Sequence, residues 1–113
     1  MANDTLDLGD EACLPCDPNQ PPMALPEASR ILKRLHEGWS INNMGRLERV
    51  FLLKDFQESL KLGCDLGEIA LKADHYPDLL IAYGTLRVEI WTHKIGGLTR
   101  ADFVLAAKFD RIS

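Results

Sequence analysis

The sequence predicts a single α+β domain in which helices cover one face of a four-stranded antiparallel sheet. The chain has 113 residues, of which 46% are hydrophobic, and this is enough for one core but too short for two. Apolar residues recur at helical spacing in some segments and alternate at strand spacing in others. The resulting order is helix, hairpin, long helix, hairpin, helix. A small open sheet leaves edges that a second copy can cover, so we expect a homo-oligomer.

Composition excludes several classes of partner. The net charge of -4 gives no reason to expect nucleic acid or a membrane surface, because neither phosphates nor anionic headgroups would attract the chain. The first 13 residues contain four acidic residues and no basic one, and no apolar run is long enough to span a bilayer. The three cysteines are an odd number, which fits a reducing compartment. We therefore expect a cytoplasmic protein.

The N-terminal segment differs in composition from the rest. Residues 1–25 are polar and rich in proline without periodicity, which predicts a loosely ordered arm before a domain at 26–113. Cys13 and Cys16 have the spacing of zinc and redox motifs. A zinc site needs four ligands, and the surrounding prolines do not fit a redox turn, so we expect no metal and no cofactor.

A short amphipathic helix is expected to begin at Pro26 and to end before Gly38. Its apolar positions follow helical spacing: Ile31, Leu32 and Leu35. A cluster of turn formers at 42–45 then separates two strand-like segments, 39–41 and 47–52. These segments predict the first hairpin.

A long helix is expected from Phe56 to Ala73, because its apolar residues fall into two rows at helical spacing. One row consists of Phe56, Leu60, Cys64, Gly67 and Leu71, and the other of Leu62, Leu66, Ile69 and Ala73. Two rows predict a helix that is buried on more than one side. Glycine inside a helix costs roughly 1 kcal/mol relative to alanine. Gly63 and Gly67 are therefore expected where a strand or another subunit approaches closely.

The second hairpin is predicted from strands at 79–83 and 86–91, joined by a turn at 84–85. Alternating apolar residues mark the core face of the later strand: Leu86, Val88 and Ile90. The last helix is expected to begin at Thr99. The hydroxyl of Thr99 and the carboxylate of Asp102 have the spacing of a capping box.

Two histidines at the ends of predicted elements are candidates for proton transfer. His75 follows the long helix and precedes Pro77, which turns the chain out of the helix. His93 precedes two glycines, Gly96 and its neighbour, where backbone can approach a ligand. If the hairpin brings the histidines to one cavity, they can serve as acid and base on one substrate, and Asp102 can orient an imidazole as well as cap its helix. The simpler alternative is that each histidine only caps the end of an element.

The C-terminal half carries a specific pattern. It reads His75-x-Pro77 with Tyr83, then Trp91-Thr92-His93-x-x-Gly96-Gly97-Leu98-Thr99-x-x-Asp102-Phe103-x-Leu105-Ala106-Ala107-Lys108-x-Asp110. This pattern resembles that of the pterin-4a-carbinolamine dehydratases, also called 4a-hydroxytetrahydrobiopterin dehydratases. The resemblance implies an α+β fold with a four-stranded antiparallel sheet, a homodimer or tetramer, and no metal. It also implies elimination of water from a 4a-hydroxytetrahydropterin, which regenerates the quinonoid dihydropterin.

The resemblance also assigns site residues. The family site is a cluster of three histidines, two of them adjacent in a His-His-Pro motif, with an acidic residue nearby. His75 matches the first histidine, His93 the third and Asp102 the acidic position, whereas Tyr76 replaces the second histidine. Tyrosine, with an ordinary pKa of about 10, donates a proton at neutral pH but is a poor base. Loss of one acid or base group lowers a rate on the order of 10²-fold.

Two functions follow from this altered motif. A branch of the family that is encoded with alpha-carboxysomes has a comparably changed site and is regarded as a Rubisco assembly factor. Tyr76 therefore favours a weakly catalytic or non-catalytic chaperone of the Rubisco large subunit, associated with carboxysomes. The alternative is an active dehydratase in pterin recycling, with His75 and His93 transferring protons.

Overall fold

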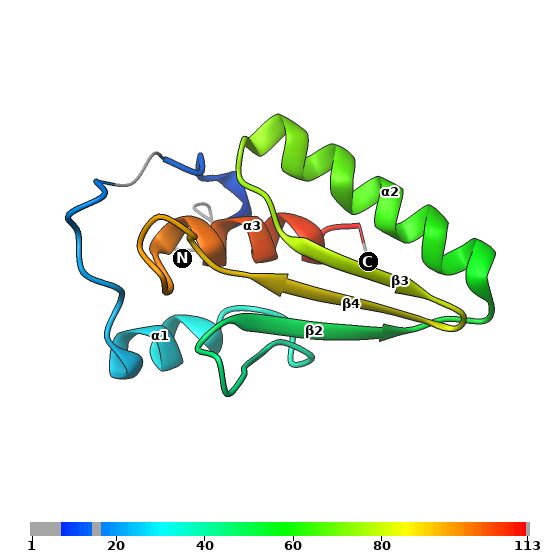
Figure 1. The fold of residues 1–113 in the computed structure, drawn as a ribbon, viewed down its shortest axis with the longest axis horizontal. Coiled ribbons are helices and arrows are strands. Elements are labelled where there is room, and N and C mark those ends of the chain that lie inside the picture. The colour runs from blue at the N-terminus through cyan, green and yellow to red at the C-terminus, as the bar shows by residue number, and fades with distance from the viewer. Residues whose placement is uncertain (1–7, 15–16, 113) are drawn as a thin grey trace, which may run out of the picture.

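The computed structural model describes residues 8–14 and 17–112. Its elements are the 3-10 helix η2 (Leu8–Asp10), α1 (Leu25–Leu32), β1 (Ser40–Ile41), β2 (Leu47–Leu52), α2 (Phe56–Ala73), β3 (Asp78–Ala82), β4 (Thr85–Ile90) and α3 (Arg100–Asp110). Within the described residues this is the predicted α+β class, with three α-helices and a four-stranded antiparallel sheet (Figure 1). None of the helices in these ranges combines the length and the apolar composition needed to cross a bilayer.

The sheet is built from the two predicted hairpins. Its strand order is β1-β2-β4-β3, so the hairpins meet where β2 pairs with β4, and α2 connects them. The second hairpin is shifted by one residue from the expectation. Its turn lies at 83–84, because Ala82 pairs with Thr85 and Gly84 takes the positive φ of +78° that this turn requires.

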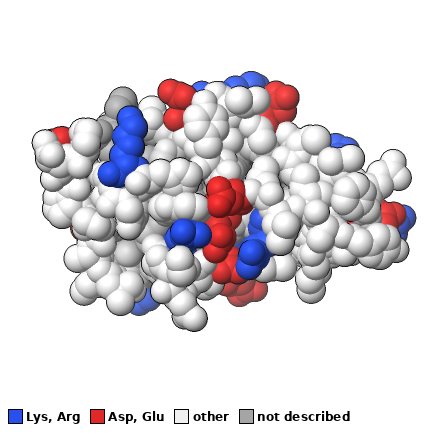
Figure 2. Space-filling model, viewed as in Figure 1, with Lys and Arg blue, Asp and Glu red and all other residues white. Residues whose placement is uncertain are grey.

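One face of the sheet is the core. In β4 the side chains of Leu86, Val88 and Ile90 are fully buried, as the alternation predicted. Phe51 and Leu47 of β2 lie opposite Leu86 and Ile90, and α2 packs against β3 and β4. The other face of the sheet is open and exposes Val50, Leu52 and Leu80. Uncharged groups cover most of the surface seen in Figure 2, with acidic side chains gathered near its centre between basic ones.

Helix α2 has the predicted bounds. The Asp55 carboxylate caps its first turn by accepting a hydrogen bond from the Glu58 backbone N–H at 2.9 Å. The row that contains Leu66 packs into the core, whereas the other row faces solvent, with Phe56 47% and Leu71 65% exposed. The expectation of burial on more than one side is therefore wrong for the single chain, because only one layer of this chain covers the helix.

The two glycines of α2 differ in what surrounds them. A Cβ on Gly63 would lie 2.9 Å from Cδ1 of Ile81, so this glycine allows β3 to approach the helix closely. A Cβ on Gly67 would meet no atom within 4 Å. Within the chain the expected close approach of a strand is thus found at Gly63 alone.

Helix α1 is shorter than predicted. It ends at Leu32, although Ile31 and Leu35 are both buried. The backbone N–H of His36 donates to the Asp110 carboxylate at 2.9 Å, a contact with the far end of the chain. A residue engaged in this way does not continue the helical hydrogen-bond ladder, so the segment 33–38 folds as turns.

The described part of the N-terminal segment packs on the domain. Leu8 is 1% exposed within the core, and η2 packs against α3. The Met23 backbone N–H donates to the Leu98 carbonyl at 2.7 Å. No periodicity in the N-terminal segment marked Leu8 as a core residue. The pair Cys13 and Cys16 lies partly outside the described residues, since the structure does not describe residues 15–16.

Asp110 connects the end of α3 to the segment after α1 and to the sheet. Its carboxylate accepts hydrogen bonds from the Trp39 Nε1–H at 2.7 Å and from Arg49 Nη1 at 2.8 Å, in addition to the His36 N–H. The side chain of Asp110 is only 19% exposed.

We expect Asp110→Ala to lower the free energy of unfolding by about 2–4 kcal/mol, because three donors lose their acceptor in a poorly solvated place. Asp65→Ala is the control. It removes only an exposed ion pair with Lys61, and such pairs contribute about 0–1 kcal/mol. Urea unfolding of both variants measures the difference. Equal stability of the two variants would show that the Asp110 contacts do not stabilise the fold.

Candidate active site

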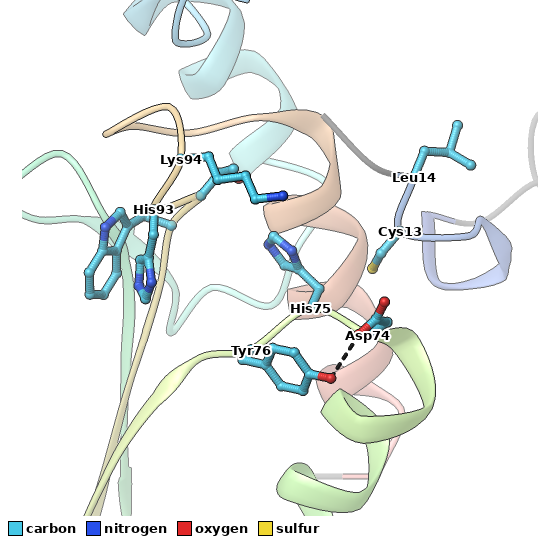
Figure 3. Close-up of a pocket in the computed structure, with 9 residues that line it drawn as sticks. Cys13, Leu14, Asp74, His75, Tyr76, His93 and Lys94 are labelled. Atoms are coloured by element: carbon cyan, nitrogen blue, oxygen red, sulfur yellow. Dashed lines mark hydrogen bonds between the residues drawn. The ribbon is translucent and has the colours of Figure 1, made fainter. Parts of the chain in front are cut away.

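His75 and His93 line the same cavity, which has a volume of about 330 Å³. It is lined by Cys13, Leu14, Asp74, His75, Tyr76, Trp91, Thr92, His93 and Lys94. These residues come from the N-terminal segment, the end of α2 and the turn after β4. Figure 3 shows His75 between His93 and Lys94 on one side and Cys13 and Leu14 on the other.

Local backbone geometry places both histidines at the cavity. Asp74, the C-cap that follows the last residue of α2, adopts the left-handed conformation with a φ of 56°, and His75 is the next residue. After β4 the chain forms a tight turn in which Thr92 pairs with Gly97. Gly96 has a φ of +72° and its N–H donates to the Thr92 carbonyl at 2.9 Å. This turn reverses the chain and places His93 at the cavity.

Asp102 lies beneath the cavity and is fully buried. One carboxylate oxygen lies 2.6 Å from Nε2 of His75. The other accepts hydrogen bonds from the Thr92 hydroxyl at 2.9 Å and from the Thr99 backbone N–H at 2.8 Å. The capping box with Thr99 is present, as predicted. Asp102 therefore caps α3 and contacts an imidazole at the same time.

These contacts fix the orientation of His75. An ionised carboxylate only accepts hydrogen bonds, so the proton of a neutral His75 lies on Nε2, and Nδ1 is the basic nitrogen. The Thr92 hydroxyl has one proton and gives it to Asp102, so the Thr99 hydroxyl, 2.9 Å away, donates to Thr92. The imidazole is held in one tautomer by a short chain of hydrogen bonds.

His93 is positioned by ring contacts. Its ring centroid lies 4.2 Å from that of Trp91, with an interplanar angle of 51°. The Arg46 guanidinium carbon lies 3.7 Å from the Trp91 ring centroid. The indole thus contacts a cation and an imidazole, which supports the wall of the cavity that carries His93.

Tyr76 forms a pair with a carboxylate. Its hydroxyl donates to Oδ1 of Asp74 at 2.7 Å (Figure 3). This hydrogen bond, together with the negative charge of Asp74, raises the pKa of Tyr76 above its usual value. At neutral pH the Tyr76 hydroxyl is therefore protonated, and its proton points at Asp74.

Several cavity residues were not identified as site residues from the sequence. Asp74 directly precedes His75, and Lys94 directly follows His93. This adjacency was the one signal for these two residues in the sequence. Leu14 carried no local signal, and the spacing of Cys13 with Cys16 indicated metal or redox chemistry and not this cavity, which both residues reach from the N-terminal segment. The Cys13 thiol lies 3.6 Å from the Ala101 carbonyl and donates to it, and burial raises the pKa of this thiol.

The cavity has the groups for acid and base chemistry. It combines two imidazoles, a carboxylate, a phenol and an ammonium group, from His75, His93, Asp74, Tyr76 and Lys94. Among the residues that the structure describes, no three His, Cys, Asp or Glu side chains are grouped as metal ligands would be. The arrangement can therefore donate a proton to one atom of a bound molecule and accept a proton from another.

Comparison with known proteins gives consistent matches over almost the whole chain. The family model described as Pterin 4 alpha carbinolamine dehydratase matches residues 21–112. A relative from Alkaliphilus metalliredigens is 40% identical over 104 residues, which are 92% of this chain and 94% of the relative. A relative from Rickettsia bellii is 40% identical over 106 residues, covering 94% of each chain. Both are provisionally named pterin-4-alpha-carbinolamine dehydratase.

A solved structure has the same fold. The crystal structure from Brucella melitensis, described as a transcriptional coactivator/pterin dehydratase, superposes with a TM-score of 0.72 at 28% sequence identity. The match covers 80% of this chain and 97% of that chain. The fold implied by the sequence pattern is therefore confirmed.

We expect Asp102→Asn to lower the free energy of unfolding by about 2–4 kcal/mol, because an amide replaces a buried acceptor that serves three donors. Thr99→Ala removes the capping hydroxyl and its hydrogen bond with Thr92 but keeps the carboxylate, and it is expected to cost about 1–2 kcal/mol. Long-range nitrogen NMR of His75 gives a second measurement. In the Asp102→Asn variant the imidazole of His75 should show mixed tautomers. An unchanged Nε2–H tautomer in this variant would mean that Asp102 does not orient His75.

Proposed function

Because the chain belongs to the pterin-4-alpha-carbinolamine dehydratase family, we propose that it removes water from a 4a-hydroxytetrahydropterin and releases a quinonoid dihydropterin. The observation that supports this activity is the 2.6 Å contact between His75 and the buried Asp102, in a cavity that His93 also lines. An imidazole that is held in one orientation and also lines a cavity is suited to proton transfer with a bound molecule.

The reaction requires two proton transfers. The C4a–O bond breaks, and the hydroxyl leaves as water after it takes a proton. The N5–H bond also breaks, and its electron pair forms the N5=C4a double bond. Both transfers need groups that exchange protons near neutral pH, which imidazoles do best. His75 and His93 are the proposed catalytic residues, and Asp102 is the positioning residue behind His75.

A second candidate rests on Tyr76, which replaces the second histidine of the family motif. In this alternative the chain is a weakly catalytic chaperone of the Rubisco large subunit that associates with alpha-carboxysomes. The open sheet face, which exposes Val50, Leu52 and Leu80, would provide its contact surface. The retained Asp102–His75 contact supports the dehydratase over this alternative.

Stopped-flow measurement of dehydration tests the proposal. We expect turnover above background, and a loss on the order of 10²-fold in His75→Ala or His93→Ala, because each removes a proton-transfer group. His36→Ala is the matched control, since His36 lies in the turn after α1 and outside the cavity. Background turnover in the wild type, together with binding of the Rubisco large subunit, would favour the chaperone instead.

We also propose that a second copy covers the exposed row of α2. Large side chains lie at the two ends of this row, at Phe56, Leu60 and Leu71, with the small Cys64 and Gly67 between them. An antiparallel pair of α2 helices would bring the large ends together and let the small centres approach closely. It would also place Lys61 of one copy near Glu68 of the other.

Sedimentation velocity checks this surface. We expect Leu71→Glu to shift the wild-type oligomer toward smaller species, because a carboxylate would be buried in the helix pair. Leu52→Glu is the control, because Leu52 is 82% exposed and lies on the open sheet face. If Leu52→Glu dissociates the oligomer and Leu71→Glu does not, the sheet face is the interface.

A further inference from the structure

Asp74 occupies a position that glycine usually fills. It is the C-cap of α2 and the one non-glycine residue with positive φ among the residues that the structure describes. This left-handed conformation is unfavourable for most side chains, and aspartate is among those that adopt it most readily. The fold needs only the backbone conformation here. The carboxylate is an addition, and it lies on the wall of the cavity.

The carboxylate is directed at Tyr76. Oδ1 of Asp74 accepts the hydroxyl proton of Tyr76 at 2.7 Å, and both side chains line the same cavity as His75 (Figure 3). Because the single proton of the phenol is engaged with Asp74, the lone pairs on the Tyr76 oxygen are left to accept a hydrogen bond from a bound molecule. The oxygen of Tyr76 is thus an acceptor in a residue that lines the cavity, although an isolated tyrosine is a poor base.

We propose that Asp74 and Tyr76 together form the base of the reaction, with Asp74 receiving through the Tyr76 hydroxyl the proton that the substrate loses. This inference rests on the proposed dehydratase function and assigns its proton acceptor to this pair, which leaves to the histidines the supply of the proton that departs with the hydroxyl. The substrate N5–H bond breaks as its proton moves to the Tyr76 oxygen. The Tyr76 O–H bond breaks as that proton moves to Oδ1 of Asp74.

The electrons and atoms balance without a further reactant. The N5–H electron pair forms the N5=C4a bond, the C4a–O bond breaks, and the hydroxyl leaves as water with a proton from a cavity histidine. Asp74 then returns its proton to solvent, and the histidine takes one up. Free phenolate never forms, so the raised pKa of Tyr76 does not oppose the transfer. The pair does the work of a base at the position where the family has its second histidine.

Separate and combined substitutions test the relay. We expect Asp74→Asn and Tyr76→Phe each to lower kcat by about 10²-fold, the contribution of a general base. The amide of Asp74→Asn can still accept the Tyr76 hydrogen bond but cannot take up a proton, so it separates proton transfer from positioning. The double variant should be no slower than either single variant, because the two residues act as a unit.

Matched controls lie outside the cavity. Asp78→Asn makes the same chemical change at the exposed start of β3, and Tyr83→Phe does so in the turn at 83–84, where Tyr83 is 76% exposed. Both controls should keep wild-type kcat. In a Tyr76→His background the imidazole accepts the proton itself. Asp74→Asn should then change kcat less than threefold, which is about 0.6 kcal/mol of activation free energy.

The outcomes separate this inference from the proposed function. If His75→Ala loses activity while Asp74→Asn and Tyr76→Phe keep it, the relay is wrong and the dehydratase stands. If the losses in Asp74→Asn and Tyr76→Phe multiply in the double variant, the residues act independently and the relay is also overturned. If the wild type shows no dehydration, both the function and the relay are overturned.

Discussion

The buried carboxylate of Asp102 is the constraint on which fold and site both depend. A carboxylate removed from water is stable only when hydrogen bonds replace its solvation. Its partners come from three places in the chain: His75 after α2, Thr92 after β4 and Thr99 at the start of α3. Because one buried carboxylate requires hydrogen bonds from all three places, the ends of three elements lie together. The cavity lies where these ends meet.

This arrangement separates the rigid part of the site from its exposed part. Asp102 is fully buried and the side chain of His75 is 16% exposed, so their geometry is set by packing. Tyr76 is 52% exposed and belongs to the outer wall of the cavity. A replacement at this outer position leaves the Asp102 hydrogen bonds unchanged. A tyrosine can thus occupy this position, for which the family resemblance implies a histidine, without loss of the fold or of the His75 orientation.

The change from histidine to tyrosine has a different meaning once its neighbour is known. Considered alone, Tyr76 is a lost base, and the sequence therefore favoured a chaperone over an enzyme. In the structure the phenol donates to Asp74, and both residues line the cavity, so a carboxylate lies behind the phenol. The chemistry of the Tyr76 phenol depends on the group that its proton contacts. That group is the carboxylate of Asp74, two residues earlier, and the turn at the end of α2 brings the two side chains together.

By itself, the sequence determined the features that depend on local periodicity and local hydrogen bonding. These are the two hairpins, the bounds of α2, the buried face of β4 and the capping box of Asp102. Tertiary structure decided the features that depend on contacts between distant residues. The bond from the His36 N–H to Asp110 shortens α1, and Leu8 joins the core. Cys13 reaches the cavity wall and donates to Ala101, 88 residues away. Periodicity reports which side of an element is apolar, whereas only the assembled chain decides what covers that side, because burial arises from elements packing against each other.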